Sequence, residues 1–173
     1  LNDPWKEPRY FYEQDGFDGI PNTEETYLLL SRYDGDLKEG IVELVDLRNF
    51  ETLHIWNPDI NAFNNMVKKV DEFKNLQTDF GNSRSTLMHP KLTIDGGLLF
   101  GWRAPLRKID ECSKLVFQNS HDIFHHSIEE DVEGNIWVPS WMYPISLPPE
   151  KVGIVNFSDD AIVKLSLDGE IIY

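Results

Sequence analysis

The residues of this sequence best suited to chemistry are its histidines, because an imidazole can act as a nucleophile, a proton carrier or a metal ligand near neutral pH. Of the five histidines, three share one short segment, NSHDIFHHSIEED, as His121, His125 and His126. His125 and His126 are adjacent, so on an extended strand their side chains point to opposite faces. We expect His126 to face the open side of a site and His125 to pack inward.

Two histidines occupy matching places in an internal repeat. His89 stands near the start of MHPKLTIDGGLLFGW and His126 near the start of FHHSIEEDVEGNIWV, and both segments continue with a turn around glycine and an aromatic strand. Side chains at equivalent places of successive repeats converge when the repeats surround an axis. We therefore predict His89, His125 and His126 as catalytic residues. His54, within the strand-like LHIW, is interpreted as a packing residue.

The same histidines could instead hold a metal ion, since imidazole and carboxylate ligands suit zinc, iron or copper. His121 and His125 have the four-residue spacing of a helical ligand pair, with Asp122 beside them, but the surrounding pattern is that of a strand. A metal-dependent enzyme therefore stays open as a second alternative. The main prediction includes no metal and no other cofactor.

Other catalytic motifs are missing from the sequence. There is no Gly-x-Ser-x-Gly elbow for a nucleophilic serine. The pair Gly96-Gly97 is an ordinary turn and does not make a phosphate-binding loop. The single cysteine, Cys112, falls in the tight turn of a hairpin and excludes an internal disulfide.

Charge and hydropathy exclude two classes of partner. The chain has 16 Lys and Arg against 30 Asp and Glu, a net charge of −14. Sequence-independent binding to nucleic acid or anionic lipid needs clustered basic residues, so we predict neither. No apolar run is long enough to cross a membrane.

Aromatic residues and a cation follow the histidine segments. Trp137 and Trp141 come after the second segment, and Trp102 with Arg103 stands at the corresponding place after the first. In one interpretation the tryptophans pack between sheets. In the other they form a wall on which an aromatic substrate stacks. We predict Arg103, Trp137 and Trp141 as substrate-binding residues, with Arg107 as a further local cation.

The elements that must position these residues are short strands joined by tight turns. The segment LRKIDECSKLVF at 106–117 aligns without a gap with IVKLSLDGEIIY at 162–173, and 41–56 is a looser third copy. Joined to the histidine segments, these hairpins give a repeat of four antiparallel strands, which is the unit of a β-propeller blade. The sequence therefore predicts an all-β fold of about three propeller blades.

Three regions follow from this interpretation. Residues 1–26, rich in proline and glycine, predict an extended arm, and residues 27–173 predict the partial propeller. Apolar residues at helical spacing predict one amphipathic helix near 60–76, capped by Asn57-Pro58, as an insertion that covers the sheet. Since a ring needs at least about four blades, we expect the N-terminal portion of a longer propeller, which self-associates through open strand edges.

The segments FHHSIEEDVEGNIWVPSWMYP and FSDDAIVKLSLDGEIIY resemble the bacterial arylsulfotransferase family, whose members work without the nucleotide sulfate donor. The resemblance extends over about residues 27–173. It implies a periplasmic, six-bladed propeller whose funnel holds several histidines and an arginine. It also implies transfer of a sulfuryl group from an aryl sulfate to a phenol through a histidine intermediate. His126 matches the early funnel histidine best, and His125 is the other candidate.

The resemblance has a limit within this sequence. The family's later His-x-Asn pattern, its downstream arginine and the histidine that carries the sulfate have no counterpart here. We therefore expect this chain by itself to be inactive. The principal alternative is a propeller that binds a ligand or a protein without catalysis.

Overall fold

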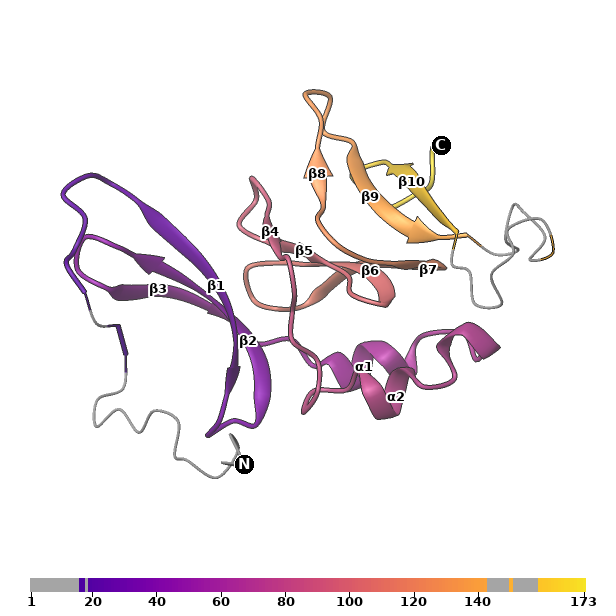
Figure 1. The fold of residues 1–173 in the computed structure, drawn as a ribbon, viewed down its shortest axis with the longest axis horizontal. Coiled ribbons are helices and arrows are strands. Elements are labelled where there is room, and N and C mark those ends of the chain that lie inside the picture. Colours follow the sequence, from indigo (N-terminus) through magenta and orange to yellow (C-terminus); the bar gives the residue numbers. More distant parts are fainter. Residues whose placement is uncertain (1–15, 18, 143–149, 151–158) are drawn as a thin grey trace.

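The computed structural model describes residues 16–17, 19–142, 150 and 159–173, and it is mainly β (Figure 1). One antiparallel sheet has the order β1-β2-β3, and a second follows the order β10-β9-β7-β6-β5-β4 with β8 paired to β9. The strands of the first sheet are β1 (Tyr27–Asp34), β2 (Glu39–Asp46) and β3 (Glu51–Trp56). Those of the second are β4 (Lys91–Leu92), β5 (Leu98–Phe100), β6 (Ala104–Ile109), β7 (Leu115–Phe124), β8 (Glu129–Glu130), β9 (Ile136–Trp141) and β10 (Asp160–Leu165).

The second sheet curls into a nearly closed six-stranded antiparallel barrel, and the predicted propeller blades are not formed. The hairpins at 106–117 and 162–173 foreseen from the repeat are present in this one sheet, and the looser copy at 41–56 belongs to the three-stranded sheet. The ten-residue strand β7 pairs with β6 and then, at its end, with β9, where Ile123 stands opposite Trp141 and Phe124 opposite Ser140. This pairing joins hairpins that separate blades would keep apart. The prediction of a partial propeller is therefore wrong.

The C-terminal edge of the barrel is covered, although an open edge was predicted there. After β10 the chain turns back, and Ile171 forms a bridge with Leu165. The backbone N–H of Lys164 donates to the carbonyl of Tyr173 at 2.7 Å, and that of Ile172 donates to the carbonyl of Lys164 at 2.8 Å. Self-association stays a prediction, but these contacts occupy the edge that was expected to drive it.

The interior of the barrel is filled by side chains that alternate along its strands. In β9 the residues are by turns buried and half-buried, as expected for a strand with one face toward a core. The core comprises Leu99, Leu106, Phe124, Ile128, Ile136, Val138, Val163 and Leu165. Burial of this apolar cluster stabilises the barrel on which the loops are mounted.

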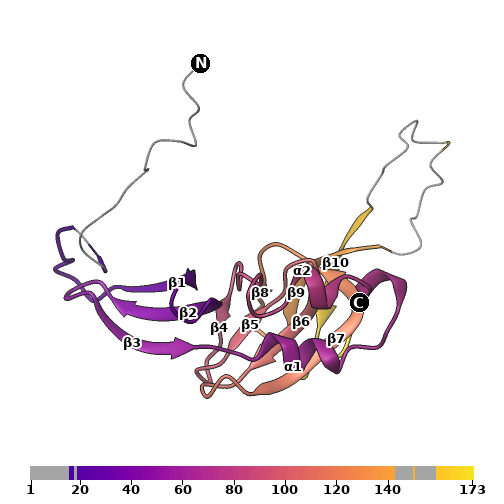
Figure 2. The same cartoon turned by 90° about the horizontal axis from the view of Figure 1, so that it is seen from below.

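The three-stranded sheet lies beside the barrel and is tied to it (Figure 2). A shared cluster of apolar residues from β2, β3, α1, β5 and β6 fills the junction. The indole N–H of Trp56 donates to the carbonyl of Gly96 at 3.2 Å, and Nε2 of His54 bonds the carbonyl of Glu111 at 2.8 Å. His54 thus has the structural role expected from its sequence.

The helical insertion is broken into three short pieces: α1 (Ile60–Asn65), a 3₁₀ turn η1 (Asp71–Phe73) and α2 (Leu76–Asp79). The prediction of one helix near 60–76 is wrong, because the side-chain amide of Asn64 donates to the carbonyls of Leu76 and Phe80, at 3.1 and 3.0 Å. A straight helix would hold residues 64 and 76 about 18 Å apart. The cap is Asp59, which accepts from the N–H of Ala62, and not Asn57-Pro58. The insertion still covers the barrel, packing against Ala104 and Ile123 of β6 and β7.

Of the predicted arm at 1–26, residues 1–15 and 18 lie outside the described residues. Nearer to β1, the chain is bonded to the first sheet, since the N–H of Asn22 donates to the carbonyl of Leu47 at 2.8 Å.

Candidate functional site

Five of the six predicted site residues lie at one end of the barrel. His89 precedes β4, Arg103 joins β5 to β6, His125 and His126 join β7 to β8, and Trp141 ends β9. Because the strands are antiparallel, these places all fall on the same side of the sheet. We call this region the histidine end, and it comprises His89, Trp102, Arg103, His125, His126 and Trp141.

The aromatic rings of the histidine end are in mutual contact. The exposed ring of His126 has its centroid 5.3 Å from that of Trp102 and 4.7 Å from that of His125. The ring of His89 lies 6.5 Å from His126 and 6.1 Å from Trp102. His89 and His126 do converge, as the repeat suggested, but across a single barrel and not from neighbouring blades.

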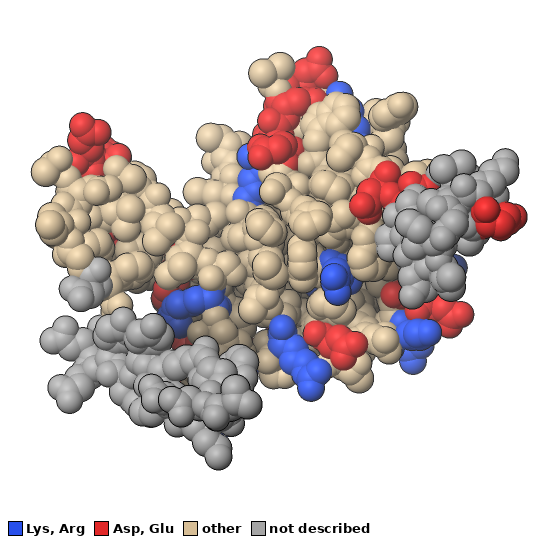
Figure 3. Space-filling model, in the orientation of Figure 1, with Lys and Arg blue, Asp and Glu red and all other residues tan. Residues whose placement is uncertain are grey.

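Arg103 supplies the positive charge of the cluster. Its guanidinium carbon lies 5.7 Å from the ring centroid of Trp102 and 5.7 Å from that of Trp141, which is cation–π distance for both indoles. On the face drawn in Figure 3, the lysines and arginines form separate small patches and no continuous basic surface. A positive charge held beside two half-buried indoles is therefore a local feature that can attract an anionic aromatic ligand.

Three residues of the cluster have left-handed backbone conformations. The φ angles are 50° at His89, 51° at Arg103 and 60° at His126. In this left-handed region, the backbone of a residue other than glycine has a strain energy of about 1 kcal/mol or more. Three of the six such residues in the described part of the chain are thus gathered here, and strained backbone of this kind concentrates at functional sites.

His125 anchors the cluster from within. It is 5 % exposed, and its Nε2 lies 3.0 Å from Oδ1 of Asp160. Burial lowers the pKa of His125, Asp160 opposes this, and the neighbouring His126 and Arg103 add to the lowering. The ring is therefore neutral at pH 7, with its Nε2 proton donated to the Asp160 carboxylate.

The burial of His125 and the exposure of His126 agree with the sequence-based prediction. The reason differs, because neither residue lies within a strand and His126 is turned outward by its left-handed backbone. Asp160 was missed. It belongs to the quoted FSDDAIV segment, but no spacing in the sequence links it to His125, which is 35 residues away.

Trp137 lies elsewhere, at the opposite end of β9. Its indole N–H donates to Oδ2 of Asp131 at 2.9 Å, and Nζ of Lys164 stands 5.1 Å from its ring centroid. Lys164 also forms an ion pair with Asp131 at 3.3 Å. Trp137 is thus engaged in fastening the β8–β9 turn, at a distance along the strand from the histidine end.

The ligand set considered for a metal is not assembled. His121 extends from β7 with a side chain that is 75 % exposed and pairs with Asp122 at 3.3 Å, whereas His125 points inward to Asp160. Within residues 16–17, 19–142, 150 and 159–173, no three His, Cys, Asp or Glu side chains are grouped so as to hold a metal ion. Cys112 is exposed in the β6–β7 turn, as expected.

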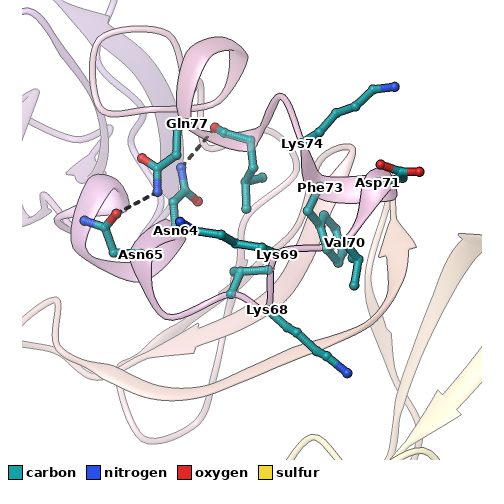
Figure 4. Close-up of a pocket in the computed structure, with 11 residues that line it drawn as sticks. Asn64, Asn65, Lys68, Lys69, Val70, Asp71, Phe73, Lys74 and Gln77 are labelled. Carbon is teal, nitrogen blue, oxygen red and sulfur yellow. Dashed lines mark hydrogen bonds between the residues drawn. The ribbon is translucent and has the colours of Figure 1, made fainter.

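A separate cavity of about 510 Å³ lies within the helical insertion, lined by Asn64, Phe73 and three lysines among others. Figure 4 shows Lys68 and Lys74 extending away from it. The amide of Gln77 donates to Oδ1 of Asn65 at 2.9 Å across its rim. Since two of the three charges point outward and no histidine lines it, we do not take this cavity as the candidate site.

Comparisons with protein-family models, with curated proteins and with solved structures find no match to this chain. In the described residues, no helix has the length and apolar character needed to cross a membrane. The case for a function therefore depends on the histidine end and on the motifs that resemble the arylsulfotransferases.

Proposed function

We propose that the histidine end binds an aryl sulfate, that His126 receives the sulfuryl group in place of the family's sulfate-carrying histidine, which has no counterpart in this sequence, and that a phenol then accepts the group. The observation that carries this proposal is the surroundings of His126. This exposed imidazole has a second histidine, His89, and the half-buried indole of Trp102 near it, and the guanidinium of Arg103 lies 5.7 Å from the rings of both Trp102 and Trp141. The export implied by the family resemblance belongs to the same proposal.

Substrate recognition would use the two parts of an aryl sulfate separately. The aromatic ring stacks on the open face of Trp102 or Trp141, where offset or edge contacts are favourable. The sulfate oxygens accept hydrogen bonds from Arg103, whose planar guanidinium suits an oxyanion. This arrangement brings the sulfur toward the ring of His126.

The transfer would take place in two steps. In the first, a ring nitrogen of neutral His126 forms a bond to sulfur while the sulfur–oxygen bond breaks, and the donor leaves as phenolate. In the second, the acceptor phenol gives its proton to His89, its oxygen bonds to sulfur, and the nitrogen–sulfur bond breaks. His126 is regenerated, and Arg103 stabilises charge on the sulfuryl oxygens throughout.

His125 has a positioning role in this scheme. Its ring packs against His126 at 4.7 Å and is itself held by Asp160. Burial lowers the pKa of His125, so this ring is neutral and acts on His126 by packing against it.

The test is a labelling experiment with 4-nitrophenyl [³⁵S]sulfate. The intact chain is mixed with the donor, quenched in alkali, and examined for base-stable, acid-labile label on the protein, then for label passed to added phenol. We expect His126→Ala to lower labelling by roughly 10²-fold or more. The matched control is His121→Ala, an exposed histidine outside the cluster, which should label as the wild type does.

Inactivity of this chain by itself, which is expected from the sequence, is the opposing outcome of the labelling experiment, so binding is measured in parallel. Quenching of tryptophan fluorescence by 4-nitrophenyl sulfate should saturate, and Arg103→Ala should weaken it by roughly tenfold, the scale of one charge-assisted hydrogen bond. Absence of saturable binding would contradict the whole proposal. Saturable binding without label on the wild-type protein would support the binding site but would contradict the role of His126 as sulfuryl acceptor.

A binding module without catalysis is the second candidate. The observation in its favour is charge: Arg103 is the sole cation of the histidine end, within a chain of net charge −14. Transfer of a sulfuryl group places negative charge on several oxygens, and sites that carry out such transfer commonly supply more than one positive group. Saturable binding with no transfer, for the whole protein, would favour this alternative.

A further inference from the structure

Arg107, in β6, carries its charge inside the molecule. The residue is 2 % exposed. Its Nε donates to Oε1 of Gln118 and its Nη2 to Oδ1 of Asn64, both at 2.6 Å, and both partners are neutral amides. Among the described residues no carboxylate lies within ion-pair distance of it, whereas Arg32, Arg48 and Arg84 each have one.

This guanidinium is charged and poorly compensated. Burial lowers the pKa of Arg107 to about 10, which leaves it protonated at neutral pH. A buried charge without a counter-charge is expensive, since hydrogen bonds to neutral groups replace only part of its hydration. An anion placed beside Arg107 would therefore interact with it strongly.

Arg107 is one of the residues that line a cavity of about 100 Å³. The lining combines polar groups with apolar and aromatic side chains, and it includes Phe80, Arg84, Met88, Phe100, Trp102 and Arg107. Nη1 of Arg107 has no acceptor in the part of the chain that is described. In that part of the chain, every side-chain nitrogen or oxygen without accessible surface has a hydrogen-bond partner. Because Nη1 has no partner, it must retain some accessible surface.

We propose that this cavity binds a small aliphatic monocarboxylate of about two to four carbons, with the carboxylate on Nη1 of Arg107 and the alkyl group against the aromatic wall. One buried guanidinium matches one negative charge. Phe80, Met88 and Phe100 offer apolar surface against which a short alkyl group can pack. Binding here does not depend on the function proposed for the histidine end, although Trp102 borders both places.

The experiment is a thermal melt of the intact chain with sodium propionate, with propionamide and with sodium chloride at equal ionic strength. Propionamide has the same shape without the charge. We expect propionate alone to raise the melting temperature, by roughly 5 °C at about fifty times its dissociation constant. An equal rise with propionamide, or no rise with propionate, would overturn the proposal.

Three variants locate the effect. Arg107→Met should abolish the response to propionate, because it removes the charge that binds the carboxylate. Met88→Phe, which reduces the free volume and keeps the charge, should also abolish the response. Arg48→Ala, whose guanidinium pairs with Asp46 in the other sheet, should keep it. A response that survives in Met88→Phe contradicts the assignment even if Arg107→Met does not fold.

Discussion

The two ends of the barrel are built differently. At the end opposite the histidines, which we call the turn end, the strands are joined by four tight turns at residues 93–97, 110–114, 131–135 and 166–170. In each turn the N–H of the fourth residue donates to the carbonyl of the first, at 2.9 to 3.0 Å. The fourth residues all have positive φ; they are Gly96, Ser113, Gly134 and Gly169.

At the histidine end the left-handed positions are His89, Arg103 and His126. The contrast concerns what occupies a strained backbone position. Three of the four turns relieve the strain with glycine, which is the residue that has least difficulty there. At the histidine end the left-handed positions are instead occupied by large polar residues, whose backbone strain is not relieved. This difference supports the proposal that the histidine end is the functional site of the barrel.

Breaking the turn end should give the largest change in stability. A Cβ added at Gly97 would collide with the backbone carbonyl oxygen of Ile109, which has no room to move within the sheet. We expect Gly97→Ala to lower the free energy of unfolding by about 1–3 kcal/mol, as measured by urea denaturation. The matched control is Gly96→Ala, whose Cβ would stand 3.7 Å from the nearest atom. This variant would lose only about 1 kcal/mol, from the positive φ of its backbone. Equal losses in the two variants would contradict the packing argument.

At the histidine end, His125→Ala should reduce stability while His126→Ala should not. His125 is buried and bonded to Asp160, so its loss should cost about 1–3 kcal/mol. The ring of His126 is exposed, and its removal should change the melting temperature little. If both variants melt together well below the wild type, the division into an anchoring and a functional histidine is wrong.

The two tryptophans of β9 allow the ends to be compared in a binding assay. Trp141 belongs to the histidine end and Trp137 to the turn end, where it bonds Asp131. We expect Trp141→Leu to weaken binding of 4-nitrophenyl sulfate by roughly fivefold to tenfold, which corresponds to loss of one aromatic contact. Trp137→Leu should bind as the wild type does and lose about 1 kcal/mol of stability with its hydrogen bond. If Trp137→Leu weakened binding and Trp141→Leu did not, Trp137 and not Trp141 would be the ligand-binding residue.

Acid should act on the two ends in different pH ranges. The pKa of His125 is lowered in the folded state, chiefly by burial, so the unfolded chain binds the proton more readily and stability falls as the pH drops below about 6.5. The pKa of Asp95, in a tight turn, is lowered to about 2, first by the hydrogen bond from Lys108. Its contribution is present above about pH 4 and is lost as the pH falls toward 2.

Urea denaturation at a series of pH values checks this comparison. Asp95 is half exposed, so solvent screening limits the lower step to about 1 kcal/mol. His125→Ala should remove the upper step only, and Asp95→Asn the lower step only. An upper step that persists in His125→Ala would assign it to another group.

The sequence alone determined the local parts of this protein. The alignment of 106–117 with 162–173 puts Ser113 opposite Gly169, and both residues occupy the left-handed position of their turns. Such hairpins close over a few residues, so their turn chemistry is present in the sequence itself. The convergence of His89 with His126 was also foreseeable from the repeat. The inward orientation of His125 and the outward orientation of His126 agree with the prediction, but they arise from a left-handed loop and not from a strand.

The tertiary structure alone decided how the hairpins combine and what surrounds the site. A hairpin has the same pattern in a propeller blade and in a barrel, and the difference lies in the pairing of β7 with β9, far apart in the chain. Contacts between distant segments bring Asp160 to His125 and remove Arg107 from water beside Asn64 and Gln118. They also fold the insertion back at Asn64, because its amide finds carbonyls twelve and sixteen residues away. These choices depend on which surfaces are buried together, and that is a property of the whole chain and not of any one segment.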